Sequence, residues 1–267
     1  MGSLEKALVV RHREVQPRYY ELEFIAPAIA KDVLPGQFVN VRVGDSYDPL
    51  LRRPFSIYNV DKKLGSITVF YKVVGRGTRQ MARIHIENRL DVMGPLGTPF
   101  SIPDGARSVV LVGGGVGIAP LVYLARVLTD HKIDVKVLLG ASSAGYLCGK
   151  DILSKLGVSL MVSTDDGSEG MKGRVTDLLA SELERTKHDF VYACGPERML
   201  ARVTEIAEQF GVPGEISLEE HMACGVGACL GCAHRVKQGA EYRYAKVCQE
   251  GPVFSIGEVL FDFGEAR

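Results

Sequence analysis

Four of the six cysteines in this chain lie in one short stretch, "CGVGACLGCAHRVKQGAEYRYAKVC", which runs from Cys224 to Cys248. Thiols gathered in this way either pair as disulfides in oxidising compartments or bind metals and carry electrons where thiols stay reduced. A chain of 267 residues is too long to depend on disulfides as a small secreted domain does. The stretch therefore predicts a metal or redox centre.

The spacing of these cysteines narrows the kind of centre. It reads C-x4-C-x2-C-x15-C, and C-x4-C-x2-C followed by a distant cysteine is the plant-type pattern for a [2Fe–2S] cluster. Glycine and alanine between the first three cysteines let the backbone approach the cluster and point N–H groups at its sulfurs. The predicted ligands are Cys224, Cys229, Cys232 and Cys248.

The histidines and cysteines also have other possible interpretations. A structural zinc site usually combines two C-x2-C units, whereas Cys248 stands alone here. Cys232-Ala-His234 suggests half of a Rieske site, but no second Cys-x-x-His follows, so we interpret His234 and His221 as ordinary loop histidines. Cys148 belongs to no motif and is interpreted as a core or surface thiol.

The composition argues against several classes of function. Lys plus Arg and Asp plus Glu each number 32 and the pI is about 7.0, so no basic excess points to nucleic acid. "MGSLEKALVV" at the N-terminus lacks the apolar core and cleavage site of a signal peptide. The apolar run over 108–125 is broken by glycines and a proline, unlike a membrane span. We expect a cytoplasmic protein of two domains or slightly more.

The pattern of apolar residues divides the chain into three parts. Residues 1–102 contain short, partly alternating segments separated by turn residues, which favours a small β-barrel. Strands and helices alternate over 103–213, which is typical of a Rossmann-like parallel sheet, and the cysteine-rich segment occupies 214–267. The expected strands of the second part are 108–113, 134–141 and 189–195, and its expected helices are 119–130, 175–186 and 196–210.

Motifs in the first part have residue types that suit a flavin. The sequence "RPFS" at 53–56 places a guanidinium, which can bind a diphosphate, three residues before a hydroxyl that can bond a flavin ring edge. Gly75, Gly77 and Thr78 lie between a strand and a short helix, where backbone N–H groups can face a phosphate. Taken alone, each pattern also fits an ordinary surface turn.

The second part opens with a glycine-rich turn, "LVGGGVGIAPL". Its glycines, Gly113 to Gly117, follow a strand and open a helix, which is the position of a dinucleotide site. Pro120 stands where the last glycine of the usual fingerprint would be, and proline suits a first helical turn. The acidic residue expected after the next strand is absent, since "LLGASS" stands there. A tight turn without a ligand is the alternative.

In this order, "RPFS", "GRGT", "GGGVGIAPL" and "CGPERM" resemble the ferredoxin–NADP reductase superfamily, in which a flavin barrel precedes a nicotinamide-nucleotide domain. With "MACGVGACLGCAHRV" and "KVCQEGPVF" added, nearly the whole chain resembles the electron-transfer subunits of class 1B dihydroorotate dehydrogenases. The small subunits of NADH-dependent ferredoxin–NADP reductases have a similar layout. They usually carry aspartate at the first ligand position, where this chain has Cys224.

The resemblance implies FAD and one [2Fe–2S] cluster as cofactors and NAD as a substrate. It also implies which residues bind them. The FAD residues would be Arg53, Pro54, Phe55, Ser56, Tyr71, Lys72, Gly77 and Thr78. The NAD residues would be Gly114, Gly115, Gly117, Cys194, Gly195 and Pro196, with Cys194 near the nicotinamide.

The function that the resemblance implies is electron transfer in pyrimidine biosynthesis. Dihydroorotate reduces FMN in a separate catalytic subunit, and electrons pass through the cluster and FAD of this chain to NAD⁺. We expect a heterotetramer of two plus two subunits, and NADH diaphorase activity from this chain alone. The alternatives are an NAD(P)H-dependent reductase for ferredoxin or an oxygenase, and a zinc-stabilised binding module without catalysis.

Two finer expectations concern specificity and contact surfaces. NAD is favoured over NADP because "GASSAGYLCGK" at 140–150 offers no arginine and only a distant Lys150 to bind a 2′-phosphate. The cysteine loop is expected to be partly exposed, with Met222, Val226 and Leu230 as candidate apolar contacts for a partner.

Overall fold

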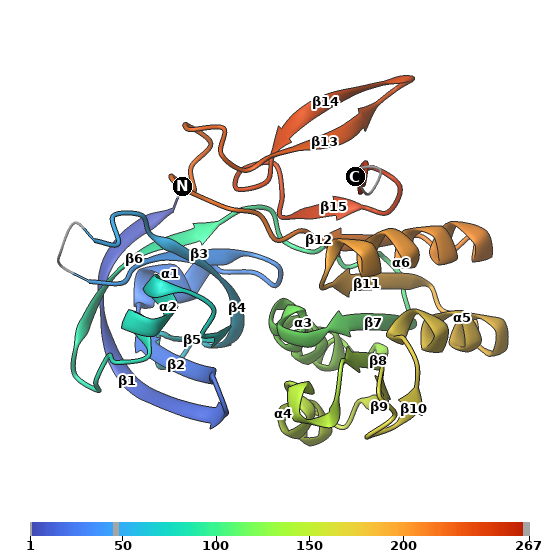
Figure 1. Ribbon diagram of the computed structural model, residues 1–267, viewed down its shortest axis with the longest axis horizontal. Coiled ribbons are helices and arrows are strands. Elements are labelled where there is room, and N and C mark those ends of the chain that lie inside the picture. Colours follow the sequence, from blue (N-terminus) through green and yellow to red (C-terminus); the bar gives the residue numbers. More distant parts are fainter. Residues whose placement is uncertain (1, 45–47, 264–267) are drawn as a thin grey trace.

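The computed structural model of this protein describes residues 2–44 and 48–263, and the parts of the chain follow the predicted order (Figure 1). Within these residues, a closed antiparallel barrel is followed by a seven-stranded sheet with helices on both faces. A hairpin extends from the cysteine-rich segment. The predicted fold class, a β-barrel before a Rossmann-like domain and a C-terminal cysteine segment, is confirmed.

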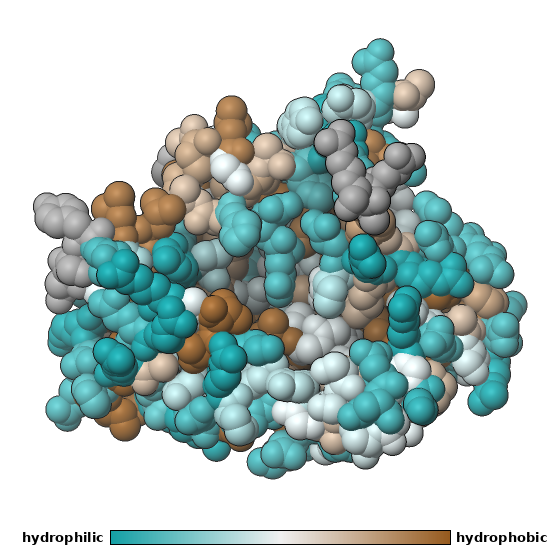
Figure 2. Space-filling model, viewed as in Figure 1, coloured by the Kyte–Doolittle hydropathy of each residue, from teal (hydrophilic) through white to brown (hydrophobic). Residues whose placement is uncertain are grey.

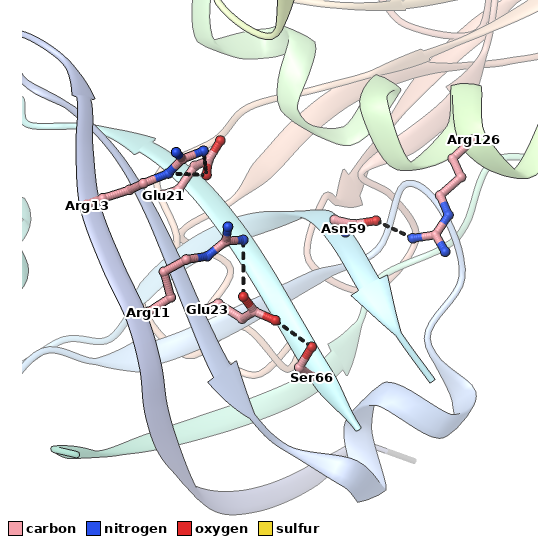
Figure 3. Close-up of polar contacts among 7 residues, drawn as sticks. All are labelled: Arg11, Arg13, Glu21, Glu23, Asn59, Ser66 and Arg126. Carbon is pink, nitrogen blue, oxygen red and sulfur yellow. Dashed lines mark hydrogen bonds and ion pairs between the residues drawn. The ribbon is translucent and has the colours of Figure 1, made fainter. Parts of the chain in front are cut away.

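The barrel strands hydrogen-bond in the order β1-β2-β5-β4-β3-β6. Their side chains alternate between the barrel interior and its surface: on β2, Leu22 and Phe24 are fully buried. Glu21 and Glu23 point outward, where they pair with arginines of β1 (Figure 3). The strands are β1 (Ser3–Gln16), β2 (Tyr19–Ile25), β3 (Phe38–Arg42), β4 (Arg53–Asp61), β5 (Ser66–Lys72) and β6 (Arg89–Leu96).

Short helices complete the barrel core. Helix α1 (Pro27–Asp32) begins at a proline, which suits a first helical position, and it buries Ile29 among the barrel residues. Helix α2 (Arg76–Met81) is the short helix that the sequence predicts after the glycine turn, and Met81 joins the same core.

The sheet of the second domain has the order β10-β9-β8-β7-β11-β12-β15. Its neighbouring strands are parallel except for the antiparallel pair β12–β15. The strands are β7 (Ser108–Gly114), β8 (Asp134–Ala141), β9 (Ser159–Thr164), β10 (Met171–Lys172), β11 (Phe190–Cys194), β12 (Gly214–Ser217) and β15 (Val253–Ser255). Of these, β9 and β10 were not expected, and the sheet continues past residue 213 through β12 and β15.

Helices cover both faces of this sheet, so its central strands are apolar on both sides. On β7, Val110 and Val112 face the set that includes residues of α5 (Val175–Arg185) and α6 (Glu197–Phe210). Val109 and Leu111 face the opposite set, which includes residues of α3 (Ile118–Asp130) and α4 (Lys150–Lys155).

The barrel is held against the second domain by a contact of α3 with β4. The Arg126 guanidinium on α3 donates to Asn59 Oδ1 at 2.7 Å (Figure 3). It also donates to the carbonyl oxygen of Val60 at 3.2 Å. The pair fixes the nucleotide-domain helix beside the strand that opens with "RPFS".

The cysteine-rich segment packs against both domains. After β12 an irregular coil carries the first three cysteines, the hairpin β13 (Ala233–Gln238) and β14 (Glu241–Lys246) follows, and β15 returns to the sheet. Cys232 and Cys248 share one buried set with Phe38 and Leu96 of the barrel. None of the described helices is long and apolar enough to span a membrane.

Candidate functional site: a cysteine loop, a flavin barrel and a nucleotide cavity

The thiols of the predicted cluster ligands converge at one place. The side chain of Cys224 is close enough to that of Cys229 to affect its pKa, and the same holds for Cys248 with Cys232 and with Cys224. Cys232 and Cys248 are buried and Cys229 is exposed. Paired thiols of this kind fit a cluster of two irons in which each iron takes two cysteines.

Backbone N–H groups surround the sulfur atoms of this loop. The chain can turn in this way because Gly225 and Gly227 have φ of +72° and +77°, a region that glycine adopts without strain. The N–H groups that approach the sulfurs are those of Val226 and Ala228 on Cys224 (3.4 and 3.3 Å), Gly227 on Cys248 (3.1 Å), Gly231 on Cys229 (3.5 Å) and Cys248 on Cys232 (3.4 Å). The loop thus holds the donors that a negatively charged cluster needs.

The pKa values of two thiols in the loop are shifted in opposite directions. Desolvation raises the pKa of Cys224, but the N–H groups of Val226 and Ala228 and hydrogen bonds with Cys229 outweigh it and lower that pKa to about 6. Burial, followed by the hydrogen bond with Cys232, raises the pKa of Cys248 to about 12. Thiolates this close together repel each other, so all of them ionise only with a cation between them.

The flavin motifs of the barrel are brought together by the fold. Arg53 begins β4, and its guanidinium lies against the start of α2, since a Cβ atom at Gly77 would be 2.6 Å from Arg53 Nε. Arg53 Nη1 donates to the carbonyl oxygen of Leu51 at 2.6 Å. Thr78 Oγ1 accepts the N–H of Gly75 at 3.1 Å, which closes the turn. A guanidinium beside a turn and a helix start can hold a diphosphate.

Two residues predicted to hold FAD lie in the barrel core. Tyr71 is buried and its hydroxyl is hydrogen-bonded to His12 Nε2 at 2.9 Å. Phe55 packs on Tyr71 with a ring separation of 5.5 Å. Burial raises the pKa of Tyr71 well above its usual value. The structure therefore places both rings where they shape the barrel wall, and Tyr71 uses its hydroxyl on His12.

Lys72 lies at the mouth of a cavity of about 580 Å³ between the barrel and the sheet. Its ammonium group sits over the rings of Tyr19 and Tyr146, at 5.2 and 5.3 Å. The cavity lies at the carboxyl ends of the central strands, where open α/β sheets bind their ligands. The predicted nucleotide residues that line it are Gly114, Gly115, Gly117, Gly195 and Pro196.

One glycine of the turn is required by a close approach of backbones. A Cβ atom at Gly117 would lie 2.6 Å from the carbonyl oxygen of Cys194, so any side chain there would push the turn away from β11. Gly117 thereby lets the glycine-rich turn and the "CGP" turn after β11 meet at the same end of the cavity.

Cys194 lies behind this cavity, beside a carboxyl group that the sequence motifs did not indicate. Its side chain is only 1% exposed. Burial and the nearby charge of Glu219 raise the pKa of Cys194, so it stays a thiol. Glu219 follows β12 and lines the cavity. Desolvation by the surrounding wall raises the pKa of Glu219 although the open cavity leaves it in contact with solvent.

Charged residues that are not among the predicted nucleotide-binding residues line the same cavity. Arg174, Arg198 and Arg202 supply guanidinium groups that suit a pyrophosphate. Asp165, after β9, is also in the lining, and its N–H donates to the carbonyl oxygen of Ala141 at 3.1 Å. Asp165 thus places a carboxyl group in the cavity from the end of β9, the strand next to β8.

Family models match two parts of this arrangement, the cysteine segment and the nucleotide domain. Residues 219–260 match the iron–sulfur cluster binding domain of dihydroorotate dehydrogenase B, and residues 111–205 match the oxidoreductase NAD-binding domain. The first match covers all of the predicted cluster cysteines and favours iron–sulfur over a structural zinc.

Relatives with the same layout are similar over their whole length. The electron transfer subunit of dihydroorotate dehydrogenase B (NAD(+)) from Desulforamulus reducens is 39% identical over 98% of this chain and 100% of its own length. The subunits of the same name from Geobacillus thermodenitrificans and Bacillus caldolyticus are 41% and 42% identical, each over 97% of this chain and 100% of their own length.

Solved structures agree on the fold. A chain of the NADH-dependent reduced ferredoxin–NADP oxidoreductase superposes with a TM-score of 0.84 at 32% identity, over 97% of this chain and 91% of that one. The ferredoxin NADP⁺ reductase of Neisseria gonorrhoeae with bound FAD and NADP superposes with a TM-score of 0.65 at 15% identity, over 78% of this chain and 93% of that one. The second likeness shows the fold of a flavin barrel followed by a nucleotide domain.

Proposed function

This chain belongs to the family of dihydroorotate dehydrogenase B electron transfer subunits, and from that premise we propose how its residues serve the function. The chain carries electrons from a catalytic subunit that oxidises dihydroorotate, through a [2Fe–2S] cluster and FAD, to NAD⁺. The reaction belongs to pyrimidine biosynthesis. We propose that the catalytic subunit contains FMN.

The observation that carries the proposal is that the barrel contacts both the cysteine loop and the nucleotide cavity. On one side, barrel residues Phe38 and Leu96 pack with Cys232 and Cys248 in one buried set. On another side, Lys72 of the barrel shares the cavity with the nucleotide turns. A flavin held by the barrel is therefore flanked by the cysteine loop and by the nucleotide.

Each part of the chain has a binding or positioning task in this proposal. Arg53 and the turn at Gly77 hold the FAD diphosphate, and Lys72 lies beside the flavin. Gly114, Gly117 and the "CGP" turn admit the nicotinamide nucleotide. FAD, when bound, joins the one-electron chemistry of an iron–sulfur cluster to the two-electron chemistry of a nicotinamide. The walls of the cavity hold the reacting rings together and exclude water.

The cysteine loop is the proposed contact surface for the catalytic subunit. Val226 and Leu230 are 51% and 64% exposed, although both are apolar. Figure 2 shows brown and tan surface over the coil that Figure 1 draws between β12 and β13. An apolar surface above a redox centre suits a partner that must come close to deliver electrons. A heterotetramer of two plus two subunits and a cytoplasmic location, which suits reduced thiols, are further parts of the proposal.

The test is to produce the chain with and without its catalytic subunit and to measure NAD⁺ reduction by dihydroorotate. We expect this activity from the complex alone, and NADH-dependent dye reduction from both preparations. Dihydroorotate oxidation by the single chain at the rate of the complex would refute the division of labour. Activity only with ferredoxin or an oxygenase would favour the reductase alternative.

A matched pair of cysteine variants separates the cluster from the flavin. Cys229→Ser, in the loop, is expected to abolish dihydroorotate-dependent NAD⁺ reduction and to leave NADH-dependent dye reduction by the single chain. Cys148→Ser is the control, because Cys148 lies outside the loop and its thiol is hydrogen-bonded within the protein, to Tyr146 O. Equal losses in both variants would contradict the proposed path.

A further inference from the structure

Asn40 is a polar residue without a visible partner for its side chain. It lies on β3, it is 0% exposed, and neither Nδ2 nor Oδ1 has a hydrogen-bond partner among the residues that the structure describes. Buried amides are almost always paired, because an unpaired one loses its hydrogen bonds to water without replacement. The environment of Asn40 should therefore contain a group that the side chains and backbone of residues 2–44 and 48–263 do not supply.

The side chain of Asn40 points at the cysteine loop. Val39 and Val41, its neighbours on β3, face the barrel core. Because side chains alternate along a strand, Asn40 lies on the opposite face, together with Phe38. Phe38 belongs to the buried set that contains Cys232 and Cys248. A Cβ atom at Gly225 would lie 2.5 Å from Asn40 Nδ2. The amide is thus packed directly on the residue that follows Cys224.

We propose that Asn40 donates a hydrogen bond from Nδ2 to a sulfur of the iron–sulfur cluster, either an inorganic sulfide or a ligating thiolate. Sulfurs of a cluster accept hydrogen bonds, and an amide N–H is a suitable donor. The inference rests on the cysteine site proposed above and adds a donor from the barrel to the N–H groups of the loop. Asn40 is a positioning residue, since it acts on the cluster and on no substrate.

The expected effect is on the reduction potential of the cluster. Reduction adds one negative charge, so a donor at a sulfur stabilises the reduced form and raises the potential. Asn40 also pairs with Pro54 in the sheet, so the same residue is tied to the flavin motif on β4. The contact would both tune the cluster and fix its loop against the strand that holds the flavin.

The first test measures the cluster potential by an EPR-monitored redox titration of the chain loaded with FAD and cluster. Asn40→Leu removes the donor, and we expect about a tenfold smaller equilibrium constant for reduction, which is about 59 mV lower in potential. Asn40→Asp replaces the donor with a charge and should lower the potential at least as far. The control Asn59→Leu removes an amide that pairs with Arg126 instead, and should leave the potential unchanged.

The second test detects the hydrogen bond in the unaltered protein. Asparagine occurs only at positions 40, 59 and 88, so side-chain ¹⁵N-asparagine labels few groups. The amide oxygen of Asn59 accepts a hydrogen bond from the Arg126 guanidinium. The amide oxygen of Asn88 accepts one from the backbone N–H of His85. Pulsed EPR of the reduced cluster should show a weak ¹⁵N coupling in the wild-type chain that is absent in Asn40→Leu.

The outcomes separate this inference from the cluster site itself. Iron and sulfide contents report on the cysteine site, whereas the potential and the ¹⁵N coupling report on Asn40. Full iron and sulfide with an unchanged potential in Asn40→Leu and Asn40→Asp would overturn the inference and leave the site intact. If both variants lose the cluster, the ¹⁵N coupling decides, and its absence in the wild type would overturn the inference as well.

Discussion

Gly77→Ala is the change that tests the proposed flavin site most sharply. Gly77 lies in the first turn of α2, where its backbone is helical and can accept alanine without strain. The added methyl group would stand 2.6 Å from Arg53 Nε, 3.0 Å from Cζ and 3.1 Å from Nη2. The first contact is closer than real side chains tolerate, so the guanidinium must move away from the turn.

The size of the expected loss in FAD affinity follows from the proposed role of the Arg53 guanidinium in binding the diphosphate. Hydrogen bonds to a charged group are worth about 1.5–3 kcal/mol, so their loss should weaken FAD binding by roughly 10- to 150-fold. Alanine in a helix is more favourable than glycine by up to about 1 kcal/mol. The cofactor-free variant should therefore be no less stable than the wild type, while its affinity for FAD falls.

The assay is a fluorescence titration of the cofactor-free chain with FAD, with thermal unfolding followed by circular dichroism. Gly75→Ala is the matched control, because its backbone is extended, with φ of −151°, and no atom lies within 4 Å of the added Cβ. We expect its FAD affinity to stay within about threefold of the wild type. Unchanged affinity in Gly77→Ala, or an equal loss in Gly75→Ala, would refute the reasoning.

Further predictions concern the cluster, the nucleotide and the carboxyl of Glu219. Serine at Cys224, Cys229, Cys232 or Cys248 should lower the iron and sulfide contents while FAD stays bound, because the flavin motifs lie in the barrel. Normal iron and sulfide contents in any of these variants would remove that residue from the ligand set. NADH should be preferred over NADPH by more than about tenfold in kcat/KM with a dye acceptor. The reason is that the negative charge of Asp165 in the cavity would repel a 2′-phosphate. A preference for NADPH would contradict this prediction. Burial raises the pKa of Glu219, so the stability that its retained proton gives is present below the unfolded pKa and is lost as the pH rises through the folded value. Glu219→Gln should therefore gain stability relative to the wild type as the pH rises above the pKa of an unfolded glutamate, measured by urea unfolding. A difference that stays constant with pH would show that Glu219 is not desolvated.

The features that the sequence predicted are those with local signals. The spacing from Cys224 to Cys248 is a pattern within one segment, and the alternation of Leu22 and Phe24 with glutamates marks a strand face by itself. The strand–turn–helix around Gly117 is similarly contiguous in the chain. The barrel, the parallel sheet and the predicted short helix at α2 could be recognised for this reason.

The features that were missed depend on contacts between distant segments. Asn40 and Gly225 are far apart in sequence, and nothing in "FVNVR" distinguishes Asn40 from a surface residue. Glu219 and Asp165 reach the cavity from strands outside the glycine motif. Tyr71 stands beside Lys72 in sequence, but strand alternation sends its ring into the barrel core. Strand β15 was missed as well, because it is a short edge strand that pairs only with β12. Such a short segment has no periodic pattern of apolar residues in the sequence.

The central claim is that electrons from dihydroorotate reach this chain only through a partner and then pass from the cluster to the flavin. It is tested most directly by anaerobic mixing of the oxidised, cofactor-loaded chain with dihydroorotate, followed by optical and EPR spectra of both cofactors. The account predicts no reduction by dihydroorotate alone. Prompt reduction of cluster and FAD should follow when the catalytic subunit is added, and reoxidation when NAD⁺ follows. Reduction of the chain's own flavin by dihydroorotate without the partner, or reduction of FAD at an undiminished rate in a complex that lacks the cluster, would contradict it.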